Sequence, residues 1–200
     1  MAFPRPLVGL LAAASLLAVP AAAQANAGSA LPPYTAADAQ FMSGMIQHHA
    51  QAILIAGWIP SHGASPALQA MGERIVVGQQ DEITIMTRWL KARGEPVPDP
   101  AAPMAHAHDH GAMMPGMLTP AQLDSLDQAR GAAFDRLFLT YMIQHHLGAI
   151  VMVNQLFATP GAAQDETTFR LASDVYADQT TEIGRMEKLQ ASLAAAAAGP

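Results

Sequence analysis

A short sequence with two adjacent histidines occurs twice in the chain, and it contains the residues best suited to bind a metal ion. Residues 41–56 read FMSGMIQHHAQAILIA and residues 138–153 read FLTYMIQHHLGAIVMV, with eight of the 16 aligned positions identical. Because residues three and four apart share a helix face, a methionine lies beside both histidines in each copy. Thioether and imidazole groups suit Cu(I), and by softness Ag(I), better than they suit Mg, Ca or Mn. The candidate metal ligands are Met45, His48, His49, Met142, His145 and His146, with Met152 two turns beyond His145.

A second repeated block, Q-x-x-E-I-x-x-M, recurs at an offset of 100 residues. If each half of the chain is an antiparallel helix pair, this block lies level with the histidines on the partner helix. A glutamate there could accept a hydrogen bond from a histidine ring and fix its tautomer, or it could bind the metal directly. We expect Met86 and Met186 to be further ligands, and Gln79, Glu82, Gln179 and Glu182 to orient the ligands.

Capping signals place these blocks on four helices. Serine or threonine before a helix accepts a bond from a free backbone N–H, and proline suits the first helical position. No segment shows sustained strand alternation. The sequence therefore predicts an all-α fold, a four-helix bundle built from a duplicated antiparallel helix pair. The expected helices begin at Thr35, Ser65, Thr119 and about Asp165, and the first three end at Pro60, near Gly94 and near Thr159, with a kink or break at Gly131.

The connection between the two halves is rich in proline, histidine and methionine. Six of the 27 residues from Gly94 to Pro120 are proline, so the segment cannot be helical throughout. Such a composition is typical of metal capture without a preformed fold, with a disordered tether as the alternative. We expect this connection to be poorly ordered without metal. Its candidate ligands form a secondary metal tract of Met104, His106, His108, His110, Met113, Met114 and Met117.

The N-terminus has the pattern of an export signal. Arg5 supplies a positive charge, residues 7–19 are apolar but short for a bilayer span, and residues 21–23 are a small-residue cleavage pattern. We expect a signal peptide over 1–23, with cleavage near Ala23 to Ala27, and favour it over an uncleaved membrane anchor. The mature protein is then periplasmic or secreted, with a short extension over 24–34, a first hairpin over 35–94, a linker over 95–119 and a second hairpin over 120–198, all in one bundle domain.

Composition excludes several classes of function. The formal net charge is −6 and there is no basic run, which argues against nucleic acid and anionic membrane surfaces as partners. Cysteine is absent, which excludes disulfides, thiolate metal sites and iron–sulfur clusters. The sequence has no Ser–His–Asp arrangement and no phosphate-binding loop. We therefore predict no enzymatic activity.

Purely structural interpretations compete with metal binding. Methionine at helical spacing is usually core filler, and a single buried histidine bonded to glutamate is commonly structural. Adjacent histidines, however, point about 100° apart and cannot both face one apolar core, which favours metal binding. His62 is alone in a turn, and we expect it at the solvated surface.

The two histidines of each pair are expected to differ. His49 shares the helix stripe of Met42 and Met45, so His49 and its counterpart His146 should hold the metal most directly. His48 leans to another side, where it is expected to pair with Glu82 or to face solvent.

The repeated M-I-x-H-H-x-x-A-I and Q-x-x-E-I-x-x-M blocks resemble those of the bacterial domain of unknown function 305 family, over roughly residues 35–193. The resemblance implies a ferritin-like helical bundle and, as in some exported members, copper binding linked to copper tolerance. Members often carry methionine after the A-I of the first block, where this chain has Ile53-Leu54-Ile55. The two halves are thus expected to bind unequally. The positions carried over are Met45, His48, His49, Met86, Met142, His145, His146 and Met186.

Three classes of function remain. The first is an exported copper-binding protein that buffers, sequesters or transfers Cu(I), with Ag(I) also possible as ligand and a periplasmic copper carrier or exporter as partner. The second is a structural or partner-binding bundle without metal. The third, a ferritin-like di-metal oxidase, is disfavoured because such sites use four carboxylates and two E-x-x-H motifs, and this chain has no E-x-x-H.

Overall fold

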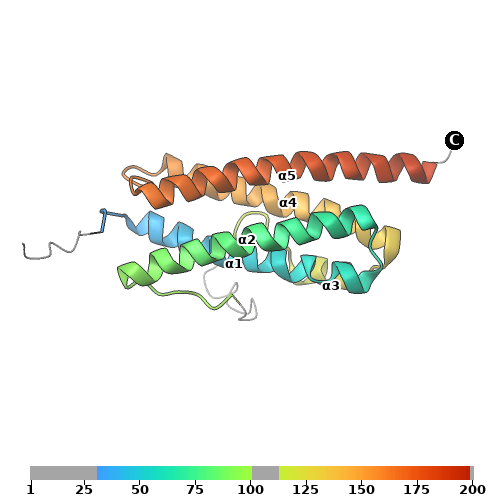
Figure 1. Ribbon diagram of the computed structural model, residues 1–200, viewed down its shortest axis with the longest axis horizontal. Coiled ribbons are helices and arrows are strands. Elements are labelled where there is room, and N and C mark those ends of the chain that lie inside the picture. The colour runs from blue at the N-terminus through green and yellow to red at the C-terminus, as the bar shows by residue number, and fades with distance from the viewer. Residues whose placement is uncertain (1–30, 101–112, 199–200) are drawn as a thin grey trace, which may run out of the picture. The chain divides into compact units, whose positions relative to one another are not determined.

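The computed structural model describes residues 31–100 and 113–198, and in these ranges all regular structure is helical (Figure 1). This confirms the predicted all-α bundle. The predicted signal peptide and most of the His/Met tract lie outside the described residues. The helices are α1 (Ala36–Ala56), η1 (Ile59–His62, a 3₁₀ helix), α2 (Pro66–Arg93), α3 (Pro120–Gln128), α4 (Gly131–Ala158) and α5 (Glu166–Ala198).

The predicted capping residues begin α1, α2 and α3. The side chains of Thr35, Ser65 and Thr119 each accept a hydrogen bond from the backbone N–H three residues ahead. At the other end of α2, Gly94 takes the left-handed conformation with φ of 70°, which glycine adopts without steric cost.

One predicted boundary is wrong, and one predicted break is confirmed. The first helix ends at Ala56 rather than at Pro60, and the short helix η1 fills the turn that follows. The third helix is divided at Gly131 as expected, into α3 and α4. Ala129 and Arg130 are extended between them, with ψ of 150° and 154°, and Gly131 has a positive φ of 55°. Extended residues cannot continue the helical hydrogen-bond ladder, so the chain changes direction there.

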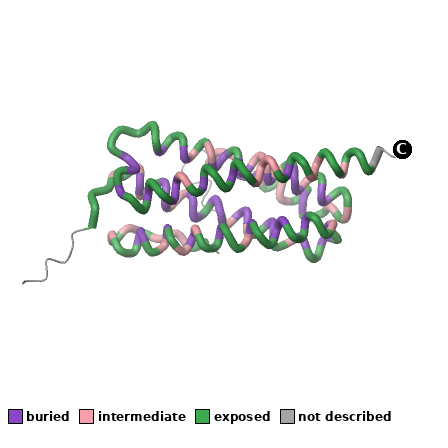
Figure 2. The backbone as a smooth tube through the Cα atoms, turned by 45° about the horizontal axis from the view of Figure 1, so that its top comes forward, coloured by how far each residue is buried: buried purple, intermediate pink, exposed green. Residues whose placement is uncertain are grey.

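Two helix pairs build the bundle. Helix α1 lies along α2, helix α4 lies along α5, and the two pairs meet mainly along α1 and α4 (Figure 1). In Figure 2 the buried stretches of the helices face their neighbours, while exposed positions face outward. The adjacent-histidine copies are on α1 and α4, so the duplicated histidines come from the two helices at the centre of the bundle.

The apolar core is divided into two clusters. The first cluster uses residues 41–46 of α1, 83–90 of α2, 149–156 of α4 and 171–175 of α5. The second uses the other halves of the same helices, including Ile55, Leu68, Met142 and Met186. Partners from opposite ends of α1 and α2 fall in the same cluster, which makes the pair antiparallel, and the same holds for α4 and α5.

A layer of polar side chains lies between the two apolar clusters. Each long helix contributes to it at the point where its contacts pass from one cluster to the other. We call this set the histidine layer. It consists of His48 and His49 of α1, Gln79 and Glu82 of α2, His145 and His146 of α4, and Gln179 and Glu182 of α5.

The end of the inter-repeat connection belongs to the core, contrary to the expectation that the whole connection is poorly ordered. Met117 and Leu118 are buried, and the Gln51 side chain bonds to both the N–H and the C=O of Leu118 at 2.8 and 3.1 Å. Gly116 lies directly against Gly148 of α4, an approach that leaves no space for a Cβ on either residue. The described part of the connection after residue 112 is therefore structural.

Within residues 31–100 and 113–198, none of the helices combines the length and the apolar character that a membrane crossing requires.

We predict that Gly148→Ala destabilises the fold. A Cβ at this position would lie 2.0 Å from the carbonyl oxygen of Pro115 and 2.5 Å from Gly116 Cα, so the segment must move off α4. We expect a loss of about 1–3 kcal/mol in the free energy of unfolding, measured by urea denaturation. The matched control is Gly78→Ala on α2, where a Cβ meets nothing within 4 Å and should stabilise the helix by about 0.5–1 kcal/mol. Equal effects of the two substitutions would contradict the proposed contact.

Candidate metal centre

Four histidine rings form a continuous row through the middle of the bundle. His48 and His49 from α1 and His145 and His146 from α4 are all fully buried. The centroids of the His48 and His145 rings are 3.9 Å apart, so the two helices meet through these rings. The outer rings His49 and His146 lie 6.4 and 6.3 Å from their sequence neighbours. The duplication has thus brought both histidine pairs into one site.

The two outer histidines are each held by a glutamate from the partner helix. His49 Nε2 donates to Glu82 Oε2 at 2.6 Å, and His146 Nε2 donates to Glu182 Oε2 at 2.7 Å. The Glu82 and Glu182 side chains keep 13% and 18% of their surface exposed, so the charges remain near solvent. Because each carboxylate accepts at Nε2, the neutral ring has its lone pair on Nδ1, which is buried without a hydrogen-bond partner.

The two inner histidines differ from each other. His48 Nε2 donates to the carbonyl oxygen of Pro115 at 3.0 Å. A carbonyl only accepts, so the lone pair of the neutral His48 ring is again on Nδ1. Neither ring nitrogen of His145 has a side-chain or backbone partner of normal hydrogen-bond geometry among the described residues. The prediction that His48 pairs with Glu82 or faces solvent is wrong, because α2 presents Glu82 to His49.

Burial keeps the inner histidines neutral. Desolvation, with a smaller contribution from the neighbouring His49 ring, lowers the pKa of His48 from 6.5 to about 3. Desolvation also holds the pKa of His145 well below its ordinary value, with a contribution from His48. A neutral imidazole has a free lone pair and can bind a metal ion without first losing a proton.

The buried ring nitrogens leave much hydrogen-bonding capacity unused. Among the described residues, Nδ1 of His48, His49 and His146 and both ring nitrogens of His145 have no partner of normal hydrogen-bond geometry. A buried polar atom without a partner typically costs about 1–3 kcal/mol. Several such atoms in one layer are therefore expensive in an otherwise apolar core. Soft-metal binding would satisfy lone pairs of this kind.

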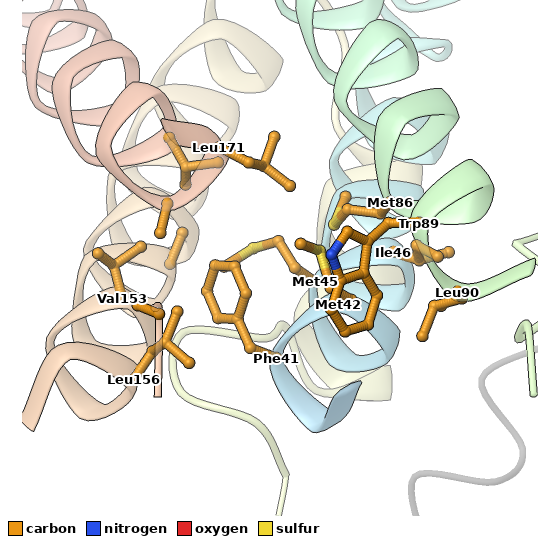
Figure 3. Close-up of a cluster of buried hydrophobic side chains, with 14 of the residues drawn as sticks. Phe41, Met42, Met45, Ile46, Met86, Trp89, Leu90, Val153, Leu156 and Leu171 are labelled. Atoms are coloured by element: carbon orange, nitrogen blue, oxygen red, sulfur yellow. The ribbon is translucent and has the colours of Figure 1, made fainter. Parts of the chain in front are cut away.

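The predicted methionine ligands lie on either side of the histidine layer. Met45 and Met86 are fully buried in the first apolar cluster, and Figure 3 shows them with Met42 among its apolar side chains. Met142 and Met186 are fully buried in the second cluster. Each half of the duplication thus contributes its methionines to its own side of the layer.

The remaining predicted site residues are dispersed. Gln79 and Gln179 are buried in the layer. Neither the amide nitrogen nor the amide oxygen of the Gln79 side chain has a hydrogen-bond partner among the described residues. Met152 is half-buried at a surface pocket together with Met114, whereas Met113 is exposed. Met117 is part of the core. The tract residues Met104, His106, His108 and His110 lie outside the described residues.

Acidic side chains also gather near the layer on α2 and α5. Partial burial raises the pKa of Asp178, and the nearby Glu82 and Glu182 carboxylates raise it further. In the part of the chain that the structure describes, no three His, Asp or Glu side chains converge as a ready metal site.

His62 shows a further correction. It is buried rather than solvated, because its ring bonds to the carbonyl oxygens of Trp58 and Asp127 at 2.8 and 2.9 Å and packs on Phe134. The contact between Pro115 and His48 was not predicted from the sequence. The one sequence feature that could have indicated it is the pair of glycines, 116 and 148, that permit the close approach.

Comparison with known proteins identifies the family. The sequence model described as domain of unknown function, DUF305, matches residues 38–190. The chain belongs to the DUF305 family. Solved DUF305 structures share its fold. A Deinococcus radiodurans fragment is 30% identical, covers 80% of this chain and 99% of its own, and has a TM-score of 0.66. A Streptomyces coelicolor protein is 26% identical, with coverages of 79% and 94% and a TM-score of 0.68.

Another solved relative binds metal. CopM in its Cu(II)-bound form is 29% identical, covers 78% of this chain and 96% of its own, and has a TM-score of 0.63. CopM has also been solved with Cu(I) and with silver. A curated protein, the uncharacterized protein L153 of Acanthamoeba polyphaga mimivirus, also resembles part of this chain. It is 36% identical over 56 residues, which span 28% of this chain and 37% of the viral protein.

We predict that acid destabilises the metal-free protein before its carboxylates titrate. In the unfolded chain a histidine has a pKa near 6.5, whereas in the folded protein the pKa of His48 and of His145 lies well below that value. The free energy of unfolding is therefore at its full value above about pH 6.5. It falls as the pH drops toward 3, with a slope approaching roughly 1 kcal/mol per pH unit for each histidine. Urea unfolding between pH 7.5 and about 5.5 measures this slope.

The matched variant is His145→Leu, which replaces a ring that makes no hydrogen bond with an apolar side chain. It should remove about half of the pH dependence. An unchanged slope in this variant would assign the acid sensitivity to other groups.

Proposed function

We propose that this DUF305 protein is an exported Cu(I)-binding protein that uses the histidine layer to buffer, sequester or pass on the ion. The observation that carries the proposal is the set of buried, unpartnered ring nitrogens contributed by both halves of the duplication. Ag(I) should bind in the same way, because it has the same soft-ligand preference.

The ligand chemistry supports a monovalent soft ion. Glu82 and Glu182 each hold a ring so that Nδ1 is free, an arrangement common around metal-binding histidines. Met45 and Met142 precede the histidines on the same helices and are buried beside the layer. Cu(I) is bound by few ligands, so two histidines with one thioether would suffice. A hard divalent ion would need more oxygen ligands than the described residues bring together.

The relatives support the same class of function. CopM, of similar fold, has been solved with Cu(I), Cu(II) and silver. The Streptomyces coelicolor relative is described as secreted, which agrees with the export signal expected over residues 1–23. Residues 101–112 would add a second, weaker store of metal. A copper carrier or exporter as delivery partner follows from the same proposal.

We predict that replacing His49 and His146 by Ala abolishes tight Cu(I) binding in a chain lacking residues 101–112, which removes the competing tract. The double variant His48→Ala and His145→Ala should bind more weakly but measurably, because only the outer rings have a carboxylate partner. Glu82→Gln should weaken binding by about 10–100-fold through loss of ring orientation. Titration against a competing Cu(I) chelator measures all three variants.

The control is His62→Gln, a buried histidine outside the layer, which should leave Cu(I) affinity unchanged. Equal losses in both double variants would refute the distinction between outer and inner rings. Parental affinity in both would mean that the histidine layer is purely structural and that Cu(I) binds elsewhere in the chain.

A further inference from the structure

A surface pocket between α1 and α4 has two methionine thioethers at its wall. Its lining includes Gly44 of α1, Met152 of α4, and Met114 and Pro115 from the end of the inter-repeat connection. A methyl group placed on Gly44 would lie 3.4 Å from Met114 Sδ and 3.4 Å from Met152 Cε. The two methionines therefore approach each other across the bare backbone of Gly44, where a side chain would otherwise intervene.

The pocket adjoins the histidine layer through a single residue. Pro115 lines the pocket, and its carbonyl oxygen accepts the hydrogen bond from His48 Nε2. Gly44 also lies one helical turn before His48 on α1. An ion held by the thioethers would thus be one turn of helix away from the first buried imidazole.

The chemistry of the pocket is selective. The polar side chains of its lining, Gln40, Gln155 and Thr159, are all neutral, and among the described residues no carboxylate lines it. Thioethers bind Cu(I) and Ag(I) but have little affinity for hard cations. Met114 and Met152 are half-buried, so each side chain is partly open to solvent and partly held by its neighbours.

We propose that Met114 and Met152 form an outer soft-metal site, which receives Cu(I) or Ag(I) at the surface and loads the histidine layer. Transfer is an exchange of thioether for imidazole ligands on a monovalent ion, so no electron moves and no oxidant is required. The Nε2–H of His48 continues to donate to the Pro115 carbonyl oxygen, and the Nδ1 lone pair of the same ring binds the ion. The loading role rests on the function proposed above, whereas the outer site itself stands independently of it.

The first test follows Ag(I) alone, added to the full chain with isotopically labelled methionine methyl groups, by NMR. The Met114 and Met152 methyl resonances should shift together. Met114→Leu should abolish the Ag(I)-dependent shift of Met152, and Met152→Leu should abolish that of Met114. The matched control, Met113→Leu, changes an exposed neighbour and should leave both shifts intact. Absence of both shifts, or a shift of either methionine without the other, would overturn the outer site.

A second variant tests the space between the thioethers. Gly44→Ala places a methyl group in ordinary contact with both methionines and favours the helix, so the protein should remain folded. We expect Ag(I) affinity at the outer site to fall by about tenfold or more. Gly78→Ala on α2 is the control and should leave the affinity unchanged. Unchanged affinity in Gly44→Ala would place the ion elsewhere.

Loading is measured separately from binding. In the double variant Met114→Leu and Met152→Leu, the rate at which Ag(I) reaches the imidazole resonances should fall about tenfold, with the same final occupancy of the layer. An unchanged rate would overturn the loading role. If the imidazoles of the parent never respond while both methionines do, the histidine-layer function fails and the outer site stands.

Discussion

Burial of four neutral imidazole rings in an apolar core is the constraint on which this structure depends. Each ring brings two polar nitrogens into a region without water, and desolvation prevents the inner rings from becoming charged. The fold satisfies only some of these nitrogens. Glu82 and Glu182 reach in from the outer helices, and Pro115 reaches in from the connection. The nitrogens that remain give the layer its capacity for ligands, at the expense of stability.

The antiparallel arrangement turns one duplicated sequence into a single site. Helices α1 and α4 cross the layer in opposite directions, so the apolar segment before the histidines in one copy is level with the segment after them in the other. The two histidine pairs therefore meet ring against ring, with His48 on His145.

The connection makes the two halves unequal. At corresponding positions of the repeat, Gln51 bonds to the backbone of Leu118, while Gly148 leaves room for Pro115 and Gly116. One chain has only one such connection, so among the described residues His48 bonds to the Pro115 carbonyl oxygen, whereas neither ring nitrogen of His145 has a partner of normal hydrogen-bond geometry. The same asymmetry places Met114 beside Met152, which has isoleucine, Ile55, as its counterpart in the first copy. This inequality of the two halves is the basis for the outer and inner metal positions proposed above.

Local patterns in the sequence determined the helices, the duplication, and the pairing of the histidine block with the glutamate block. Caps at Thr35, Ser65 and Thr119 depend on neighbouring residues alone, and the His–Glu pairs follow from the length of each hairpin. Only tertiary structure decided which ring of a pair meets the carboxylate, that His62 is buried, and that Pro115 binds His48. These contacts join segments more than 30 residues apart, so no helical period in the sequence encodes them. The approach of Pro115 and Gly116 to α4 depends on the absence of a Cβ at glycines 116 and 148, a fit that exists only once the distant segments are packed together.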